Sequence, residues 1–482
     1  MRVAMFVYNN CTRDARVFKE ATSLVQAGHE VTVFAVLDKQ TLPSERRSGF
    51  LIVRIDRDPP HYKLLRALRR VARARRLVRA RAKRGVRRLD LRASAVARRA
   101  RHVRGPRRWF LAPIGLVAAA AHRCLAVLQP RTGEPEAPVA TPGRPAWHRA
   151  LLLFHKPLMF LDYYRRGYRA ALAGSFELFH AHDLNTLPVA AALSRRTGGR
   201  LIYDAHELYP DISTLSRLES RIWRLVERRL IRRADRVLTV CDSIADVLAR
   251  RYGVSRPTVV LNCPLRLPPS PTRDGVDPLR GPLGLAPDVP VVLYQGGFSP
   301  NRGLGTLVLS ARLLRAGVVV LMGWGSLEAE LRTAIETEGL EERIMLLPPV
   351  PQSDVVLACT HATLGVIPYE PRGLNNLFST PNKLFDFMAA GVPLVGTQMP
   401  ELTRFIVGCD IGVTVPSGDV ARLASGIQDL LDHPARRLLM RENALAASRR
   451  YCWDEEQRAL LDVYAPETNR SEGTPLSPGV VS

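Results

Sequence analysis

A glycine-rich turn in the second half of the chain has the residue types that bind a phosphate group. Residues 295–304 read Gln-Gly-Gly-Phe-Ser-Pro-Asn-Arg-Gly-Leu; they follow an apolar run and open a helical pattern. Glycines let the backbone approach a ligand, and the first N–H groups of a helix have no partner within the helix. Arg302 adds a positive charge. We therefore expect Gly296, Gly297 and Arg302 to hold a diphosphate. Glycine-rich turns between a strand and a helix are common in α/β proteins, so the turn alone is weak evidence.

A second segment, residues 379–393, carries charged residues at the start of another predicted helix. Pro381 suits the first turn, and Lys383 lies in the same turn, where a cation opposes the helix dipole. Such a placement costs stability and suggests a function, such as contact with an anion. Asp386 follows three residues later on roughly the same face, where a carboxylate could accept hydrogen bonds from ribose hydroxyls. The alternative interpretation is a surface ion pair between Lys383 and Asp386.

Parallel β-sheets are the elements that must position these residues. Nearly continuous apolar runs alternate with amphipathic helical patterns in two separate blocks, which is typical of parallel strands covered on both faces. We expect two facing Rossmann-like, doubly wound α/β domains with the site in an interdomain cleft, beyond the carboxyl ends of the strands. The expected strands are 3–8, 31–36, 51–55, 178–182, 201–205, 237–240, 259–261, 291–295, 318–322, 344–347, 364–368, 394–396 and 412–415. The expected helices are 15–27, 187–196, 218–233, 304–315, 327–337 and 381–390.

Composition indicates where these domains begin and end. A Pro/Gly-rich stretch around residues 264–290 is typical of a linker. We expect an N-terminal domain at 1–265 that carries an insertion at about 60–150. The remaining boundaries are a linker at 266–288, a C-terminal domain at 289–440, helices at 441–465 that pack back on the N-terminal domain, and a disordered Ser/Pro/Gly-rich tail at 466–482.

Four segments carry a resemblance to a known family. Residues 14–33 pair an Asp-Ala-Arg-Val-Phe-Lys-Glu-Ala helix start with a following strand, residues 180–184 read His-Ala-His-Asp-Leu, residues 203–208 read Tyr-Asp-Ala-His-Glu-Leu, and residues 381–393 read Pro-Asn-Lys-Leu-Phe-Asp-Phe-Met-Ala-Ala-Gly-Val-Pro. The last resembles the P-x-K-x-x-E-x-M-A-x-G-x-P signature of family 4 glycosyltransferases, which have the GT-B fold, and the others resemble motifs of the same family in the same order. The resemblance covers about 370 of the 482 residues.

The resemblance implies a retaining transfer of a hexosyl group from a nucleotide-sugar donor, which would bind the C-terminal domain. Arg302 and Lys383 would hold the diphosphate together with the amides of Gly296 and Gly297, and Asp386 would hold the ribose. The two cations and the helix amides would stabilise the charge that the departing diphosphate gains.

The N-terminal domain would contribute the acceptor side. By resemblance, His182 would lie near the transferred sugar, and Arg16, Asp183, His206 and Glu207 would line the acceptor site. Without the motif, His182 reads as a histidine at a strand end whose neighbours satisfy it. The resemblance does not identify the acceptor. If the basic and apolar insertion at 60–150 meets a membrane, we expect a lipid-linked acceptor, a precursor of a cell-envelope polysaccharide, and otherwise a sugar.

The sequence departs from the family pattern in two places. Many relatives have Glu eight residues before the second acidic position of the signature, where this chain has Phe378, and that second position is Asp386. The Gly-Arg that often opens the phosphate turn is Gly-Gly here. We expect side chains just before the signature to contact the sugar in place of the missing Glu: Asn375, Asn376 and Ser379.

Neither a metal site nor a disulfide framework is predicted. No Asp/His cluster has ligand spacing except residues 180–183, so we expect no cofactor and no required metal. The seven cysteines are scattered, odd in number and without a Cys-x-x-Cys pair, which favours a reducing compartment. The first apolar run is too short for a signal peptide. We therefore expect a cytoplasmic protein.

Positive charge is concentrated in one stretch. The net charge is +25, and residues 61–110 contribute +19 of it, from 18 Arg and 2 Lys against one Asp. Beside this stretch lie apolar runs at 110–128 and 151–161, and the first is too short and interrupted to span a bilayer. The pattern suits a peripheral protein on an anionic membrane surface, at the inner face of the cell membrane. A solvated helical insertion is the alternative, and nucleic acid is not expected as a partner, because few aromatic residues are present to stack on bases.

Two other functions compete with a transferase. A membrane- or nucleic-acid-associated scaffold with a decayed donor site would account for the missing Glu. A glycoside hydrolase would need two carboxylates about 5–9.5 Å apart across a sugar site. Glu207 and Glu370 are the candidates, but the phosphate-binding pattern would then be unexplained.

Overall fold

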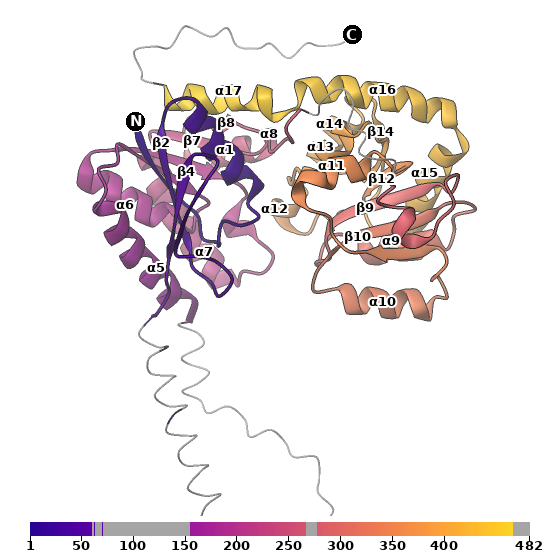
Figure 1. The fold of residues 1–482 in the computed structure, drawn as a ribbon, viewed down its shortest axis with the longest axis horizontal. Coiled ribbons are helices and arrows are strands. Elements are labelled where there is room, and N and C mark those ends of the chain that lie inside the picture. The colour runs from indigo at the N-terminus through magenta and orange to yellow at the C-terminus, as the bar shows by residue number, and fades with distance from the viewer. Residues whose placement is uncertain (60–61, 63–69, 71–154, 267–276, 466–482) are drawn as a thin grey trace, which may run out of the picture. The chain divides into compact units, whose positions relative to one another are not determined.

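Two β-sheets of mostly parallel strands organise the described part of the chain (Figure 1). The computed structural model describes residues 1–59, 62, 70, 155–266 and 277–465. The chain divides into two compact units: Met1–Asp56 with Tyr163–Ser482, and Arg57–Asp162. Both sheets belong to the first unit. The basic insertion expected at 60–150 and the tail expected at 466–482 lie outside the described residues, apart from residues 62 and 70.

The first sheet has eight strands, all parallel except β3. Their order across the sheet is β3-β4-β2-β1-β5-β6-β7-β8, so the chain begins at the centre and winds outward in both directions. The strands are β1 (Arg2–Phe6), β2 (Glu30–Val36), β3 (Ser44–Arg47), β4 (Phe50–Ile55), β5 (Leu178–His182), β6 (Arg200–Ala205), β7 (Arg236–Thr239) and β8 (Thr258–Val259).

The second sheet has six parallel strands in the order β11-β10-β9-β12-β13-β14. The reversal of direction at β9 is the topological switch point at which doubly wound sheets bind ligands. The strands are β9 (Val291–Gly297), β10 (Val318–Trp324), β11 (Ile344–Leu347), β12 (Leu364–Ile367), β13 (Leu394–Thr397) and β14 (Gly412–Val415). The two sheets confirm the expected pair of Rossmann-like α/β cores.

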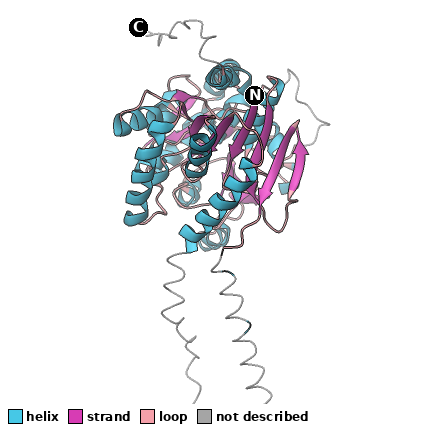
Figure 2. Ribbon diagram, turned by 90° about the vertical axis from the view of Figure 1, so that its left-hand side faces the viewer, coloured by secondary structure: helices cyan, strands magenta, loops and turns pink. Residues whose placement is uncertain are grey.

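Helices follow most strands, and Figure 2 shows them lying against the strands. Three have a side-chain cap at the start: Asp14 accepts a hydrogen bond from the Val17 amide at α1, and Ser216 and Asp419 cap α7 and α15 in the same way. The helices are α1 (Ala15–Gln26), α5 (His155–Leu172), α6 (Leu187–Thr197), α7 (Arg217–Leu230), α8 (Asp242–Tyr252), α9 (Leu304–Ala311), α10 (Glu328–Thr337), α11 (Val355–Cys359), α12 (Gly373–Leu377), α13 (Asn382–Ala389), α14 (Pro400–Ile406), α15 (Val420–Asp432), α16 (Pro434–Arg450) and α17 (Trp453–Tyr464).

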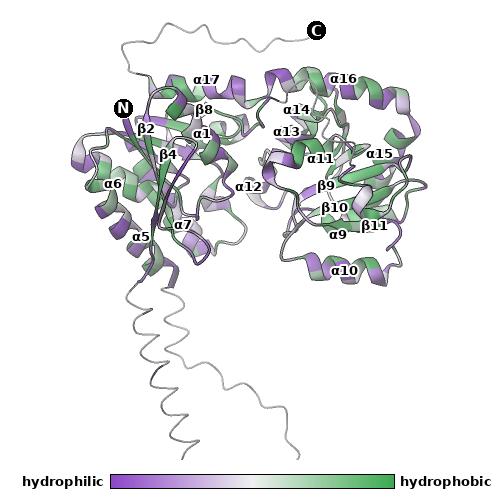
Figure 3. Ribbon diagram, in the orientation of Figure 1, coloured by the Kyte–Doolittle hydropathy of each residue, from purple (hydrophilic) through white to green (hydrophobic). Residues whose placement is uncertain are grey.

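The strands are apolar because both of their faces are buried. Along β1, Ala4 and Phe6 belong to one core cluster, and Val3 and Met5 belong to another on the opposite face. A third cluster is built around the second sheet. In Figure 3 the strands are mostly green, whereas helices such as α10 alternate green and purple along their length. Continuous apolar runs therefore predicted the strands, and amphipathic periodicity predicted the helices.

Helix α17 packs on the sheet of the first half of the chain. Trp453 and Tyr464 lie in the same core cluster as Val3 and Met5 of β1. The Trp453 Nε1–H donates to Ser23 Oγ of α1 at 2.9 Å, and the Tyr464 hydroxyl lies 2.5 Å from Nδ1 of His180. The C-terminal helix is thus part of the first sheet's core.

Some elements differ from the sequence-based expectation. Strand β3 was not predicted, because its sequence Ser-Glu-Arg-Arg has no apolar residue; it forms as an antiparallel edge to β4. Helix α9 ends at Ala311 instead of residue 315. Helix α16 runs through the boundary expected at residue 440.

The structure supplies two observations that bear on environment. Within the described ranges, no helix is both long enough and apolar enough to cross a bilayer. The six described cysteines are free thiols, and burial raises the pKa of Cys11 and of Cys241 to about 12. The thiols of Cys11 and Cys241 are therefore protonated at neutral pH.

Candidate functional site

The expected phosphate turn lies at the carboxyl end of β9, at the switch point of the second sheet. Gly296 has a φ of +119°, and a Cβ on it would come within 3.3 Å of Lys383 Nζ. Gly303, just before α9, has a φ of +66°, and a Cβ there would overlap the Pro368 carbonyl oxygen at 1.7 Å. Only glycine fits these two positions. The turn therefore brings open backbone next to a lysine from a distant helix.

Lys383 is a buried cation in the first turn of α13. It is 5% exposed, and its Nζ makes no hydrogen bond to any described residue. Its Nζ lies over aromatic rings, 3.5 Å from the ring centroid of Tyr294 and 5.1 Å from that of Tyr369. Burial, followed by the charge of Arg302, holds the pKa of Lys383 well below its usual range. A buried ammonium without a carboxylate partner is costly, and an anion would relieve that cost.

Arg302 completes a pair of cations at the turn. Its guanidinium lies 4.4 Å from the ring centroid of Tyr369, the ring that Lys383 also approaches. Two like charges are thus held beside one aromatic ring, next to Gly296. The structure brings Gly296, Arg302 and Lys383 together, as the sequence predicted, in an arrangement suited to a diphosphate.

Asp386 lies one turn further along α13 and is almost fully buried. Its Oδ2 accepts a hydrogen bond from Gln295 Nε2 at 2.9 Å. Burial raises the pKa of Asp386 to about 6, against the opposing effects of the Gln295 hydrogen bond and the charge of Lys19. Among the described residues, Asp386 and Lys383 form no ion pair with each other. The surface ion pair that was the alternative interpretation is therefore wrong, because both side chains are buried.

The residues expected to replace the missing Glu are engaged with the protein. Asn375 accepts a hydrogen bond from the Leu208 amide (2.9 Å) and donates one to Glu207 Oε2 (3.0 Å). Asn376 donates to the Arg372 carbonyl, and Ser379 donates to the carbonyl of Asn376. Phe378 packs against a core cluster of the first sheet. This segment thus contacts the first half of the chain, a role that the sequence did not reveal.

His182 lies at the end of β5 and is buried and neutral. Its Nδ1 is 3.1 Å from His206 Nε2, and its ring stacks on His180 at 4.2 Å between centroids. Burial lowers the pKa of His182. Its Nε2 has no hydrogen-bond partner among the described residues. A neutral imidazole with one uncommitted nitrogen can donate to, or accept from, a ligand hydroxyl.

Asp204, at the end of β6, is the centre of a buried polar network that sequence reasoning missed. Arg16 donates to both of its carboxylate oxygens, at 2.8 and 2.9 Å, and His206 Nε2 lies 3.0 Å from Oδ2. Although burial raises the pKa of Asp204, the charges of Arg16 and His206 outweigh it and hold that pKa well below its usual range. Asp204 stands inside the Tyr-Asp-Ala-His-Glu segment, which was the available signal.

The other acceptor-side candidates lie around this network. Asp183 has a φ of +64° and accepts a hydrogen bond from the His206 amide at 3.1 Å. Burial raises the pKa of Asp183 to about 7. Burial lowers the pKa of His206, but the carboxylates of Asp183 and Asp204 raise it to about 10, so His206 is positively charged at neutral pH. Glu207 instead turns to Asn375.

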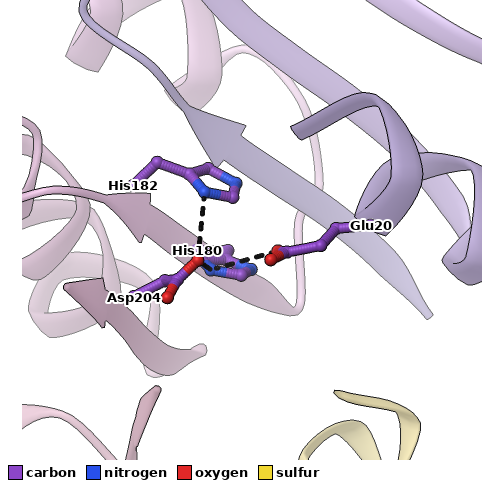
Figure 4. Close-up of side chains that lie close together, drawn as sticks. All are labelled: Glu20, His180, His182 and Asp204. Atoms are coloured by element: carbon purple, nitrogen blue, oxygen red, sulfur yellow. Dashed lines mark ion pairs between the residues drawn. The ribbon is translucent and has the colours of Figure 1, made fainter. Parts of the chain in front are cut away.

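Four side chains of the network could together coordinate a metal ion. Glu20, His180, His182 and Asp204 offer ligand atoms that all lie within 4.8 Å of one another, and Figure 4 shows them converging. However, Arg16 Nε already lies 2.9 Å from Glu20 and 2.8 Å from Asp204. A metal ion would have to displace this buried guanidinium from both carboxylates. The donor set therefore fits a network neutralised by Arg16 better than it fits a metal centre.

A polar pocket opens beside the network. It has a volume of about 450 Å³ and includes Arg16 and His206 of the expected acceptor residues, but not His182, Asp183 or Glu207. Arg13, another lining residue, has its guanidinium 5.4 Å from the ring centroid of Trp324. The lining residues are Asn9, Asn10, Arg13, Asp14, Ala15, Arg16, His206, Asn262, Gln352 and Asn382. Side-chain amides and guanidinium groups of this kind can bind a ligand rich in hydroxyl groups.

Comparison with protein-family models identifies both halves of the chain. Residues 114–264 match the model of a glycosyl transferase 4-like domain, and residues 289–433 match the model of glycosyl transferases group 1. Together the two matches cover more than half of the chain.

Curated relatives agree with these models. The chain is 28% identical over 324 residues to D-inositol 3-phosphate glycosyltransferase 1 of Catenulispora acidiphila, a match that covers 63% of this chain and 75% of the relative. It is 27% identical over 353 residues to 2-deoxystreptamine N-acetyl-D-glucosaminyltransferase of Streptomyces fradiae. This match covers 68% of this chain and 77% of the relative.

Solved structures share the fold. Sucrose-phosphate synthase of Thermosynechococcus elongatus superposes with a TM-score of 0.64 at 17% identity over 96% of this chain and 98% of that one. Anabaena HepE in complex with UDP-glucose superposes with a TM-score of 0.62 at 15% identity. This match covers 96% of this chain and 99% of HepE.

Proposed function

Because this chain belongs to the family 4 glycosyltransferases and has their GT-B fold, we propose that it transfers a hexosyl group from a nucleotide-sugar donor to an acceptor hydroxyl with retention of anomeric configuration. One observation carries the proposal above the others. Lys383 and Arg302 meet at the glycine turn of the second sheet, and neither forms an ion pair with a carboxylate among the described residues. A diphosphate is the anion that fits such a seat.

The donor would place its diphosphate against the turn and its ribose toward Asp386. As the bond to the anomeric carbon breaks, negative charge grows on the departing diphosphate, and Lys383, Arg302 and the first amides of α9 are placed to stabilise it. Anabaena HepE is described in complex with UDP and with UDP-glucose. This supports a uridine diphosphate sugar as the first donor to try.

The polar pocket lined by Arg13, Arg16 and His206 would take the acceptor. The named acceptors of two relatives, D-inositol 3-phosphate and 2-deoxystreptamine, both carry many hydroxyl groups. The abundance of side-chain amides in the pocket suits that chemistry. His182, with its uncommitted Nε2, would contact the transferred sugar.

We further propose an acceptor that is a sugar or a lipid-linked precursor of a cell-envelope polysaccharide. A solved structure with a TM-score of 0.59, WaaG, is described as involved in lipopolysaccharide biosynthesis, which supports this class. The enzyme would act at the inner face of the cell membrane, and the basic stretch at 61–110 would meet anionic lipids.

The family identity removes one alternative. A glycoside hydrolase would require Glu207 and Glu370 as a catalytic pair. Glu207 instead accepts a hydrogen bond from Asn375, and Glu370 is paired with Arg372 at 2.6 Å. The chain is a glycosyltransferase.

Product analysis tests the proposal. The protein should convert a nucleotide-sugar and a polyhydroxylated acceptor into a glycoside and a nucleoside diphosphate, and NMR of the glycoside should show the anomeric configuration of the donor. A product of opposite configuration would contradict the retaining mechanism. Release of free sugar with no glycoside, across a panel of acceptors, would contradict transfer itself.

A further inference from the structure

Helix α7 (Arg217–Leu230) exposes an unusual amount of apolar side chain. Leu218, Ile222 and Leu225 are 68%, 52% and 55% exposed. Their spacing of four and three residues places them on one face of the helix, where they form a continuous stripe. We call these three residues the α7 stripe. An isolated exposed leucine needs no explanation, but three in register on one helix suggest a contact.

The charged side chains that α7 exposes are all positive. Five arginines of α7 are exposed: Arg217, Arg221, Arg224, Arg228 and Arg229. Arg224 pairs with Asp211 at 2.9 Å, and no carboxylate among the described residues pairs with the other four.

Neither acidic residue of α7 is fully exposed: Glu219 is partly buried at the start of the helix, and Glu227 is buried. Glu219 closes the capping box with Ser216, its Oε2 accepting from the Ser216 amide at 2.9 Å. Glu227 is fully buried and accepts hydrogen bonds from the hydroxyls of Tyr203 (2.7 Å) and Tyr252 (2.6 Å). The outer face of α7 therefore combines an apolar stripe with arginines and has no exposed acid.

We propose that the α7 stripe and its flanking arginines form a second contact of this enzyme with an anionic lipid surface. A helix with this composition lies in the plane of the interface, with its apolar side chains among the acyl chains and its arginines at the phosphates. The surface is carried by the described fold and is separate in sequence from the basic stretch at 61–110. Its existence does not depend on the identity of the donor or acceptor.

Other occupants fit less well. Three side chains expose far less than the roughly 800 Å² per partner that a stable protein–protein interface buries. A nucleic acid would favour exposed aromatic rings for base stacking, whereas Trp223, the only aromatic residue of α7, is half-buried and packs edge-on against Tyr209. A lipid surface uses both the apolar stripe and the arginines.

Vesicle binding by the full chain tests the proposal. The variant Leu218→Ser, Ile222→Ser, Leu225→Ser should partition about tenfold more weakly than wild type onto vesicles of phosphatidylcholine mixed with phosphatidylglycerol, because three apolar side chains no longer insert. The matched control replaces three comparably exposed leucines elsewhere with serine: Leu309, Leu438 and Leu439. It should partition within about twofold of wild type.

A second variant tests whether weaker binding comes from misfolding of the first. Hydrogen exchange tests whether α7 itself, and not another segment, contacts the vesicles. Replacing Arg221, Arg228 and Arg229 with glutamine should weaken binding to the mixed vesicles, with little change on pure phosphatidylcholine. Hydrogen exchange should slow in peptides covering 217–230 when wild type binds the mixed vesicles. Unchanged partition of the serine variant, or protection confined to 61–128, would overturn the proposal. So would a wild-type dimer that the serine variant abolishes, or protection of α7 by a DNA duplex but not by vesicles.

Discussion

Lys383 is a buried lysine whose Nζ makes no hydrogen bond to a described residue. Its burial and the nearby charge of Arg302 both lower its pKa, and the charge of Asp386 opposes this shift without cancelling it. Substitution by methionine keeps most of the side-chain volume and removes the charge. We expect Lys383→Met to lower kcat for sugar transfer by about 10²–10³-fold, since one donor of charge stabilisation in the transition state is lost. Initial rates at saturating donor measure this.

Lys383→Met should lower kcat without lowering the free energy of unfolding. Urea unfolding of Lys383→Met should give a free energy equal to or above that of wild type, because an unpaired buried charge is removed. The control is Arg312→Met, whose side chain is 69% exposed and pairs only with Glu338 at 3.4 Å. A Lys383→Met enzyme that transfers sugar within about threefold of the wild-type rate would show that Lys383 does not act on the diphosphate.

Asp386 should make donor affinity depend on pH. Burial raises its pKa to about 6, and only the ionised carboxylate accepts hydrogen bonds from both ribose hydroxyls. A nucleotide-sugar diphosphate has no titration near that pH, so its Kd should rise about tenfold between pH 7 and pH 5. Asp386→Asn should bind more weakly at pH 7 and show no such dependence. Calorimetric titrations at several pH values measure both, and a flat wild-type profile would contradict the assignment.

Asp386 should affect folding stability in the opposite way: lowering the pH weakens donor binding but makes the contribution of Asp386 to stability more favourable. A carboxyl group whose folded pKa is raised contributes stability below its unfolded pKa, near 3.9, and loses that contribution as pH rises through about 6. Asp386→Asn should therefore be at least as stable as wild type at pH 7. Thermal melts across this range check the sign.

Sequence patterns identified a site residue where it departs from a local preference of secondary structure. Lys383 was predicted because a cation opposes the dipole at a helix start, and the structure places it beside Gly296 and Arg302. Asp204 was missed, because its partner Arg16 is 188 residues away in sequence and no local rule pairs them. The contact of Asn375 with Glu207 was missed for the same reason.

At the scale of elements, helix α17 is held in the first sheet's core by two buried aromatic residues, Trp453 and Tyr464. Trp453 is 2% exposed and donates a hydrogen bond to Ser23 of α1. We expect Trp453→Ala to reduce the free energy of unfolding by about 3–5 kcal/mol, because a large cavity forms in the first sheet's core. The matched control Trp324→Ala removes a ring that is 49% exposed and should change stability by less than about 1 kcal/mol. Equal losses in the two variants would mean that α17 is not anchored through Trp453.

Apolar periodicity predicted most strands to within two residues, because parallel strands are covered on both faces and leave a continuous signal. β10 was expected at 318–322 and runs over Val318–Trp324. β3 has no such signal: its Ser-Glu-Arg-Arg sequence pairs only along one edge of β4. α9 was predicted too long because the apolar pattern continues past Ala311 after the helix ends.

For the whole molecule, the buried network of the first sheet bears on the metal requirement. Arg16 pairs with Asp204 and lies 2.9 Å from Glu20, whose pKa burial raises to about 8, and these are two of the four potential ligands. We therefore expect sugar transfer to be unchanged, within about twofold, after treatment with EDTA and removal of the chelator. Restoration of a lost rate by one divalent ion alone would contradict this, and Glu20→Gln would then show whether the network holds that ion.

The two halves were predictable as a pair of Rossmann-like sheets, since strand and helix signals alternate in each. The contacts that join residues across the halves were not, because they depend on loop conformation. Asn262 and Asn382, for example, share a hydrogen bond of 3.0 Å across 120 residues of sequence. The polar pocket, which includes both residues, was accordingly predicted only as a cleft.

Donor binding tests the central claim most directly. Thermal melts of wild type, Arg302→Ala and Lys383→Met should be recorded with a panel of UDP-, GDP-, dTDP- and ADP-sugars. A ligand at about 100 times its Kd stabilises the folded state by about 2.7 kcal/mol, so one nucleotide-sugar should raise the wild-type Tm by several degrees and leave both variants nearly unchanged. No shift with any nucleotide-sugar, or equal shifts in all three proteins, would contradict a diphosphate seat at Arg302 and Lys383.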